Sequence, residues 1–324
     1  MSKRYENDRD WLEKHLRDLM TIGKEIWEYD SALPSHLPTY AKGYWTALKL
    51  ICLKYYIPVY LNILGSKNWR VAYVDLFAGP GLNLIGDAQV PLPGSPLIPI
   101  EHPGTQRRFD FHVFGDTNKE YTAALRKRLA YYMDSSNCRL YSDAVEVYDR
   151  DANELVKELP NLLKEHSIKH SLVFADPEGL ELRWESLRYL SENLKYSDWI
   201  ILFPSAGLNR LMGCKDEVSW RRIREFIGPN SEELEKDPTE GKAVDLYRSN
   251  LADLGKDIST EIAVVGPGSF HYHLIPAVRT TKGESPWFQN CFGPAKEKIE
   301  SLSGDILKIV MQQIERKQSV IEGF

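Results

Sequence analysis

One short segment, Asp75-Leu76-Phe77-Ala78-Gly79-Pro80-Gly81, constrains this chain more than any other. It follows an apolar run, residues 71–74, that predicts a short buried strand. Glycine at alternate positions of the turn permits backbone angles that a side chain forbids, and it lets a ligand approach the main chain closely. In a Rossmann-like sheet such a turn forms the floor of a nucleotide-shaped pocket. We therefore expect the cofactor-binding residues to include Asp75, Phe77, Ala78, Gly79, Pro80 and Gly81.

The pattern D-x-F-x-G-x-G resembles the first motif of S-adenosylmethionine (SAM)-dependent methyltransferases, particularly the variant of nucleic-acid methylases. It is less similar to the G-x-G-x-x-G of NAD enzymes, because Asn83 and Leu84 stand where a third glycine would be needed. A Gly-Pro-Gly segment after a strand can also be an ordinary turn. The order of the segments that follow decides between the two interpretations.

The bulk composition sets wide limits. A chain of 324 residues can form one large α/β core with an added lobe, or two modest domains. An apolar content of 43% and a charged content of 27% are ordinary for a soluble globular protein. The net charge of −5 argues against a surface coated in basic residues for nonspecific nucleic-acid binding, but it leaves room for a local basic groove.

Cysteine spacing and hydropathy bear on metal content and location. The four cysteines lie far apart without a C-x-x-C pair, so we expect neither a zinc site nor an iron–sulfur cluster built from this chain alone. The N-terminus is charged and lacks an apolar signal core. No apolar stretch is expected to be long enough to span a bilayer. These features predict a cytoplasmic protein without membrane contact.

Strand and helix patterns alternate along the chain. Apolar runs at 109–114, 139–141, 171–175 and 199–204 predict strands separated by helices, and runs at 261–265 and 270–278 predict a closing antiparallel pair. The prediction is an α/β fold with a Rossmann-like, doubly wound, mostly parallel sheet. Two helices, over 8–29 and 39–64, precede it, and the Gly/Pro-rich stretch 82–96 is expected to hang over the pocket as a loop.

This pattern suggests a division of the chain. Residues 1–68 form an N-terminal helical segment, and 69–204 together with 259–280 form the methyltransferase-like core. Residues 205–258 are a helical insertion, and 281–324 are a C-terminal helical tail.

Acidic residues follow the predicted strands, where doubly wound sheets bind their ligands. Asp116 follows the second strand and could accept from both ribose hydroxyls of a nucleoside. Asp143 follows the predicted third strand and could accept from an adenine amino group. Any one of these carboxylates could simply cap a turn. Four of them in register with a glycine-rich first turn favour SAM as the cofactor.

The fourth strand ends in Asp176-Pro177-Glu178-Gly179, which we predict to be the catalytic segment. Many amino-methylating enzymes carry D/N-P-P-aromatic there, where the acid accepts from the target amino group and the aromatic ring stacks on an extruded base. This chain keeps Asp176 and Pro177 but has Glu178 and Gly179 in the remaining places. Stacking at that point is lost unless Trp184 or Tyr44 substitutes.

Two further groups favour structural interpretations. His271 and His273 share one face of a strand without metal-like spacing to acids, so we expect a satisfied pair on the sheet surface and no metal site. Three arginines, at 221, 222 and 224, read as a solvated helix face, although a basic groove there stays open.

These motifs together resemble the three-Cys-motif partner (TcmP) family of prokaryotic methyltransferase-like proteins, over roughly residues 40–280. The resemblance rests on Lys49-Leu50-Ile51-Cys52-Leu53-Lys54-Tyr55-Tyr56, on the glycine-rich turn, on Gly94-Ser95-Pro96-Leu97, on Asp176-Pro177-Glu178-Gly179-Leu180 with Trp184, and on Phe203-Pro204 with Asn209-Arg210. It implies a partner protein that is radical-SAM-like and carries three cysteines, so an iron–sulfur cluster would belong to the partner.

Three functions remain open from the sequence. The first is a SAM-dependent methyltransferase with an unidentified acceptor, for which nucleic acid or a nucleotide-like substrate is one option. The second is a catalytically silent SAM- or nucleotide-binding scaffold for the partner, which the departure at Glu178-Gly179 motivates. The third is a Mg²⁺-dependent nucleic-acid processing enzyme that uses Asp176 and Glu178 as ligands.

Overall fold

A central sheet organises the protein. The computed structural model describes residues 8–322 except 102–106, 135–139, 215, 267–269, 282, 284 and 303. Seven strands follow the order β10-β11-β8-β7-β2-β5-β6, and β9 pairs with β11. Their bounds are β2 Val71–Asp75, β5 Phe111–Asp116, β6 Val145–Asp149, β7 His170–Ala175, β8 Ser197–Phe203, β9 Ile258–Ser259, β10 Ile262–Val265 and β11 His271–Val278.

The strand directions confirm the predicted fold class. Strands β6, β5, β2, β7 and β8 are parallel to one another, whereas β11 runs antiparallel to β8 and β10 antiparallel to β11. The chain moves outward from β2 to β5 and β6, and then returns to β7 on the other side of β2. The strand order therefore reverses beside β2, which is where ligands bind in doubly wound sheets.

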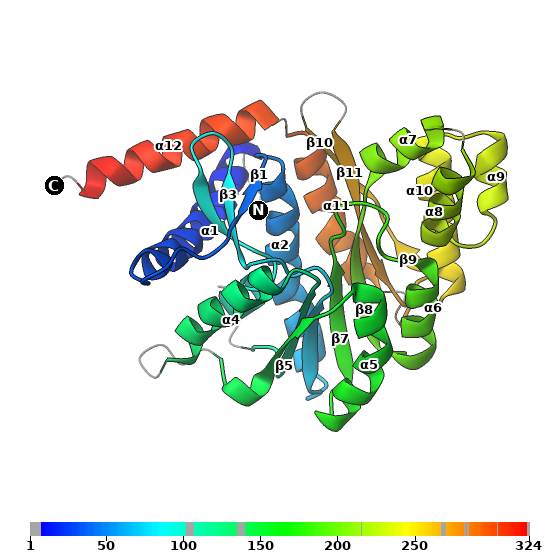
Figure 1. Ribbon diagram of the computed structural model, residues 1–324, viewed down its shortest axis with the longest axis horizontal. Coiled ribbons are helices and arrows are strands. Elements are labelled where there is room, and N and C mark those ends of the chain that lie inside the picture. The colour runs from blue at the N-terminus through cyan, green and yellow to red at the C-terminus, as the bar shows by residue number, and fades with distance from the viewer. Residues whose placement is uncertain are drawn as a thin grey trace.

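Helices cover both faces of this sheet (Figure 1). Side chains alternate along β2, so that Val71 and Tyr73 join one apolar core and Ala72 and Val74 join the other. The first core includes α1 Asp8–Ser31, α2 Thr46–Gly65, α4 Lys119–Met133, α11 Pro286–Glu300 and α12 Gly304–Glu322. The second includes α5 Ala152–Glu165, α6 Trp184–Asn193, α7 Ser205–Cys214, α8 Glu217–Ile227, α9 Ser231–Lys236 and α10 Glu240–Asp253.

The segment before the first strand of the core differs from the prediction. The second helix begins at Thr46 and not at Thr39, because residues 40–42 form a short strand, β1 Tyr40–Lys42. This strand pairs with β3 Leu82–Ile85, which pairs in turn with β4 Val90–Pro93. The stretch expected to be a loop is therefore largely a β-hairpin, followed by the short helix α3 Ile98–Glu101. Strand β1 lies close to the glycine-rich turn and brings polar side chains to it.

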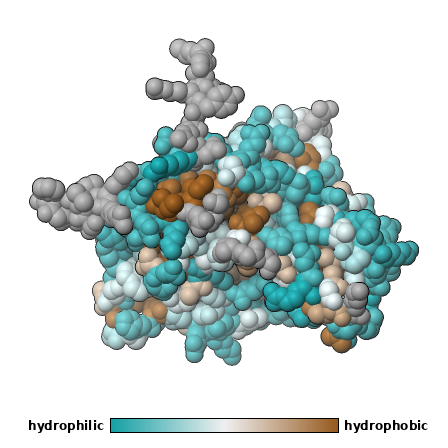
Figure 2. Space-filling model, turned by 90° about the horizontal axis from the view of Figure 1, so that it is seen from above, coloured by the Kyte–Doolittle hydropathy of each residue, from teal (hydrophilic) through white to brown (hydrophobic). Residues whose placement is uncertain are grey.

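The C-terminal tail contains two helices, α11 and α12. Helix α12 extends away from the body of the protein in Figure 1. Ile306 and Ile309 of α12 are exposed. Figure 2, which views the molecule from above, shows apolar side chains gathered on part of that face of the molecule. The division of the chain into four segments stays a prediction.

One helix bears on the membrane prediction. By length and composition alone α2 could cross a membrane, contrary to the expectation that no apolar stretch reaches that length. However, 67% of its most apolar window is buried inside the protein, as in a core helix of an ordinary α/β domain.

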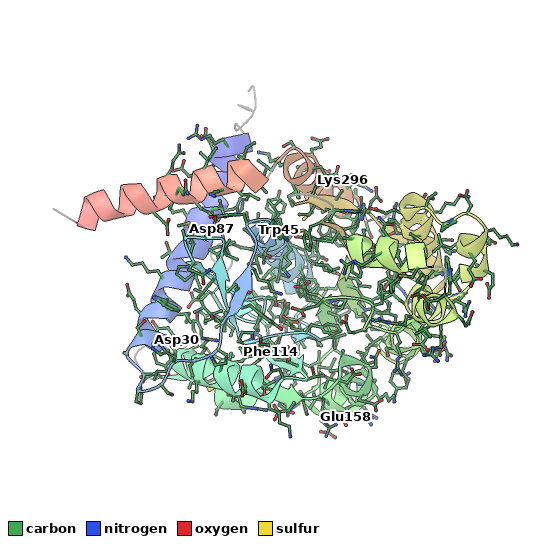
Figure 3. All side chains as sticks on the ribbon, turned by 45° about the horizontal axis from the view of Figure 1, so that its top comes forward. Asp30, Trp45, Asp87, Phe114, Glu158 and Lys296 are labelled. Carbon is green, nitrogen blue, oxygen red and sulfur yellow. The ribbon has the colours of Figure 1, made fainter. Side chains whose placement is uncertain are left out.

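A buried arginine joins the N-terminal helix to the glycine-rich turn. The guanidinium of Arg128, on α4, is fully buried and pairs with Asp30 near the end of α1, which Figure 3 labels. It also donates to the carbonyl oxygens of Pro38 (3.0 Å) and Pro80. A buried charge needs such a complete set of partners, because desolvation without them is costly. Arg128 therefore fixes the turn relative to the segments on both sides.

Candidate functional site

A cavity of about 730 Å³ lies at the carboxyl edge of the sheet. Its walls come from the residues that follow β2, β5, β6, β7 and β8, together with β1, α2, α7, α8 and the start of β11. This size is typical of a small-molecule or cofactor site. The position agrees with the site predicted from the motif, because the strand order reverses at the same place.

The glycine-rich turn forms one wall of the cavity. Gly79 and Gly81 have φ angles of +61° and +87°, in the left-handed region that favours glycine. A Cβ atom on Gly79 would lie 2.5 Å from the ring of Tyr40, so the tyrosine covers the turn directly. Phe77, Ala78, Pro80 and Gly81 line the cavity, whereas Gly79 lies beneath Tyr40. The turn thus presents main-chain atoms to the cavity from a fixed conformation.

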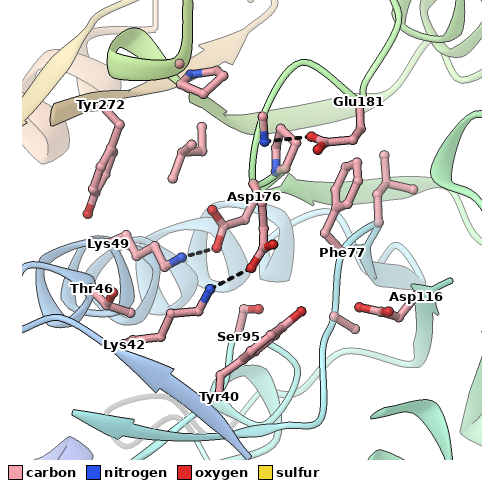
Figure 4. Close-up of a pocket in the computed structure, with 18 of the residues that line it drawn as sticks. Tyr40, Lys42, Thr46, Lys49, Phe77, Ser95, Asp116, Asp176, Glu181 and Tyr272 are labelled. Carbon is pink, nitrogen blue, oxygen red and sulfur yellow. Dashed lines mark hydrogen bonds and ion pairs between the residues drawn. The ribbon is translucent and has the colours of Figure 1, made fainter. Parts of the chain in front are cut away.

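Asp116 lies at the end of β5 and lines the same cavity, as predicted (Figure 4). One carboxylate oxygen accepts from the amide of Gly79 at 3.0 Å, and the other accepts from the amide of Asn118 at 2.8 Å. Burial raises the pKa of Asp116, while these two amides act in the opposite direction. Each oxygen keeps a second lone pair, so the carboxylate can still accept from a ligand hydroxyl.

Asp75 does not line the cavity. It is fully buried beneath the turn, where it accepts from the amide of Phe77 at 3.2 Å and from the hydroxyl of Tyr73 at 3.5 Å. Burial raises the pKa of Asp75 to about 7. The residue therefore positions the turn from behind, and the structure gives it no direct approach to a ligand.

The prediction for Asp143 is wrong. The third strand is β6, residues 145–149, so Asp143 lies in a 3₁₀ turn before the strand and not after it. It lines a different cavity of about 590 Å³ at the opposite edge of the sheet, together with Arg70 and His112. The residues that follow β6 and do line the first cavity are Arg150, Asp151 and Ala152.

The three predicted catalytic residues, Asp176, Pro177 and Glu178, all line the cavity. Asp176 is paired with Lys49 of α2, and both side chains are largely buried. Glu178 is paired with Lys42 of β1 at 2.9 Å, although its side chain is 68% exposed. Figure 4 shows both lysines reaching toward these carboxylates from the N-terminal segments. Each acid therefore has a cation beside it, which the sequence did not reveal.

Aromatic residues do line the cavity, but not the two that were expected. Trp184 is buried in the core beside Tyr247, and Tyr44 packs against Gly86, so neither replaces the missing aromatic residue after Pro177. The aromatic residues that line the cavity are Tyr40, Trp45, Phe77, Phe270 and Tyr272.

Of the predicted histidine pair, His271 lines the cavity and His273 lies behind it on the same strand. His271 contacts Glu240 at 2.5 Å through its Nε2 atom, and Glu240 also accepts from the amide of Asn209. His273 lies 3.7 Å from the same carboxylate and contacts the hydroxyl of Ser205. Burial acts to raise the pKa of Glu240, yet the hydrogen bonds from His271 and Asn209 outweigh it and lower this pKa. Across the described residues, no group of three or more His, Cys, Asp or Glu side chains is arranged to hold a metal ion.

Comparisons with known proteins find likenesses in structure only. No protein-family model matches the chain, and no curated protein is similar to it at a significant level. A Legionella pneumophila protein of the family designated DUF519 is 13% identical, with 77% of this chain and 92% of that chain covered and a TM-score of 0.44.

Two methyltransferases are also similar in structure. The METTL16 methyltransferase domain is 14% identical, with 71% of this chain and 67% of that one covered and a TM-score of 0.37. The magnesium protoporphyrin IX methyltransferase of Synechocystis PCC 6803, solved with bound SAM, is 9% identical, with 86% of this chain and 100% of that one covered and a TM-score of 0.34. At such identities and scores a likeness says nothing about activity.

Proposed function

We propose that this protein is a SAM-dependent methyltransferase. The observation that carries the proposal is the convergence of the Gly79–Gly81 turn and the Asp116 carboxylate on one cavity, at the point where the strand order reverses. A turn held by two positive φ angles approaches a ligand closely, and a carboxylate at the next strand end matches the hydroxyls of a ribose. The turn and the carboxylate together thus fit an adenosyl cofactor.

Specific residues would hold this cofactor. Asp116 would accept from the ribose hydroxyls, and the main chain of residues 77–81 would contact the methionine part. Arg150, Asp151 and Ala152 take the place proposed for Asp143, at the end of the third strand. When bound, SAM supplies a methyl group already activated on a sulfonium, so the protein acts chiefly by positioning.

Asp176 and its lysine would act on the acceptor. Asp176 lies at the end of β7 beside the cofactor-binding half of the cavity, where its carboxylate can orient a nucleophile that carries a proton. Lys49 pairs with this carboxylate and holds it in place. The nucleophile would attack from the side of α2 and β11, because Thr46 and Tyr272 also line that part of the cavity.

Transfer of a labelled methyl group tests the activity. The purified protein is incubated with methyl-labelled SAM and with separate nucleic-acid, protein and small-molecule fractions of cells. We expect label in one fraction, and we expect Asp176→Asn to abolish most of the incorporation while SAM binding persists. Incorporation that is equal for the wild type and Asp176→Asn would contradict the role given to this residue.

A silent scaffold is the second candidate, and one observation favours it. Lys49 engages Asp176, and no aromatic residue follows Pro177 in the segment 176–181. In this version the protein binds SAM without turnover and serves a radical-SAM-like partner that carries three cysteines and its own iron–sulfur cluster, as the TcmP resemblance implies. Co-expression of the two proteins followed by co-purification tests the partner. Methyl transfer in the labelling experiment would exclude a silent role.

The magnesium-dependent alternative gains no support. Asp176 and Glu178, its expected ligands, are each paired with a lysine, and a lysine ammonium competes with a metal cation for the same oxygens.

We also propose a cytoplasmic location for the protein, on the sequence features alone.

A further inference from the structure

Charge is unevenly distributed around the cavity. Among the described residues, the acids that line it are Asp116, Asp151, Asp176, Glu178 and Glu181. Asp116 is the last residue of β5, and the others lie in the loops after β6 and β7. The wall made by α7, α8 and the start of β11 contributes two arginines, Arg210 and Arg222, and no carboxylate among the residues described. The arginine wall therefore suits an anionic ligand, whereas Asp176 and Glu178 in the other half are already paired with lysines.

Both arginines are available to a ligand. Arg210 and Arg222 are exposed, and neither guanidinium makes an ion pair or a side-chain hydrogen bond within the part of the chain that the structure describes. Arg224, on the same helix as Arg222, differs because it is paired with Glu217 and Glu235. Arg222 is exposed, as a solvated helix face predicts, and it also lines the cavity, which agrees with the basic groove that the sequence left open. A guanidinium fork matches phosphate oxygens in geometry and in charge.

An aromatic platform stands on the same side. Phe270 lines the cavity and is 42% exposed, so its ring is accessible to a ligand. Its ring packs on Trp45 with centroids 4.7 Å apart, and its carbonyl oxygen accepts from the amide of Gly266 at 2.8 Å. Exposed rings beside basic side chains are the arrangement that stacks bases and holds phosphates.

The platform and Arg210 are held by a common anchor. Glu240, at the start of α10, accepts from Asn209 of α7 and contacts His271 of β11, both at 2.5 Å. Asn209 precedes Arg210 in the chain, and His271 follows Phe270. Three elements are thus fixed relative to one another next to the ligand-facing residues, so the surface is organised before a ligand arrives.

We propose that Trp45, Phe270, Arg210 and Arg222 form the acceptor subsite, and that it binds a nucleobase carrying a phosphate. This proposal rests on the proposed methyltransferase function and names its substrate class. The base stacks on Phe270, and the phosphate contacts the two guanidinium groups. A free nucleotide and a single-stranded nucleic acid share this chemistry, and the experiment separates them.

The test measures binding of a short fluorescein-labelled oligoribonucleotide, the matching oligodeoxyribonucleotide and an abasic version by fluorescence anisotropy. Nucleoside monophosphates and unphosphorylated nucleosides serve as competitors. We expect Arg210→Ala and Arg222→Ala each to weaken oligonucleotide binding by about tenfold or more, because each removes a charge-assisted contact to phosphate. Phe270→Ala should weaken binding by about tenfold for oligomers that carry bases and leave the abasic oligomer unchanged.

Matched controls keep the outcomes distinct. Arg221→Ala, an exposed arginine of α8 that does not line the cavity, should bind like the wild type. Competition by monophosphates indicates a nucleotide acceptor, and displacement by oligomers alone indicates nucleic acid. If SAM binds by calorimetry but neither nucleotides nor oligomers bind, the subsite proposal is overturned and the methyltransferase proposal stands. If SAM does not bind either, the proposed function itself fails.

Discussion

Lys49 of α2 contacts the carboxylate of Asp176 at the end of β7, and both side chains are largely removed from water. These two residues are separated by 127 positions in the chain. Helix α2 therefore completes the site, because it supplies a positive charge beside Asp176. Because the second lysine, Lys42, pairs with an exposed acid, the two pairs offer a direct comparison of buried and exposed interactions.

Removal of the buried cation should cost more than removal of the exposed one. Lys49→Met leaves the carboxylate of Asp176 uncompensated in a poorly solvated place, and we expect a loss of about 2–4 kcal/mol in the free energy of unfolding. Lys42→Met should cost about 1 kcal/mol or less, because Glu178 stays hydrated. Urea denaturation of both variants measures the difference. Equal midpoints would show that the Lys49 pair has no special weight.

The stability of the protein should depend on pH through Asp75. Burial raises its pKa to about 7 in the folded state, from 3.8 for the free side chain. The folded protein therefore holds this proton more tightly than the unfolded chain. The contribution to stability is complete below about pH 4 and is lost as the pH rises toward 7.

Asp75→Asn provides the check on this pH dependence. The amide cannot ionise, so the variant should lack the part of the decline between about pH 4 and pH 7 that belongs to Asp75. Denaturation midpoints measured at several pH values for both proteins reveal the difference. Parallel curves would show that Asp75 does not titrate in this range.

The glycine-rich turn should tolerate no side chain at its first glycine. Gly79→Ala introduces a Cβ atom at a φ of +61°, only 2.5 Å from the ring of Tyr40. We expect a loss of about 1–3 kcal/mol in the free energy of unfolding and much weaker SAM binding. Gly213→Ala is the matched control, since Gly213 does not line the cavity and nothing lies within 4 Å of its added Cβ atom. A Gly79→Ala protein with unchanged SAM affinity would refute the role of the turn.

Arg128 should affect both stability and the site. Arg128→Met removes the contacts to Asp30, Pro38 and Pro80 and leaves a buried carboxylate without its cation, at a cost of about 3–5 kcal/mol. Arg126→Met, on the same helix, removes a half-exposed pair with Asp149 and the hydrogen bonds to Val147 and Thr122, and it should cost about 1 kcal/mol, because water can replace these contacts. Thermal and urea unfolding measure both values. A mild effect of Arg128→Met would contradict the view that this residue anchors the turn.

The sequence predicted the sheet because its central strands are short apolar runs bounded by turns, and buried parallel strands have this pattern. The prediction from the sequence was wrong for the third strand. Strand β6 is partly exposed and carries alternating polar residues, whereas the run at 139–141 that was chosen lies partly outside the described residues. Asp143 was misplaced for this reason. The alternation Val145-Glu146-Val147 was the signal that could have located the strand.

The site was predicted only where its residues lie next to strand ends. Asp116 and the segment 176–178 follow strands directly, so their place in the fold follows from the order of elements. Lys49, Arg210, Arg222 and Phe270 reach the cavity from helices and from an antiparallel strand, and their approach depends on tertiary packing. Local pattern contains no information about such packing, which is why Arg222 was assigned to a solvated helix face and the other three residues were given no role in the site.

Calorimetric titration of SAM into the wild type, Asp116→Asn and Asp143→Asn tests the central claim most directly. Asp116 lines the cavity at the end of β5, whereas Asp143 lines a separate cavity at the opposite edge of the sheet. We predict that SAM binds the wild type and Asp143→Asn equally, and that Asp116→Asn binds it about tenfold or more weakly, because a charged acceptor for the ribose is lost. Absence of SAM binding to the wild type, or equal losses in the two variants, would contradict the account.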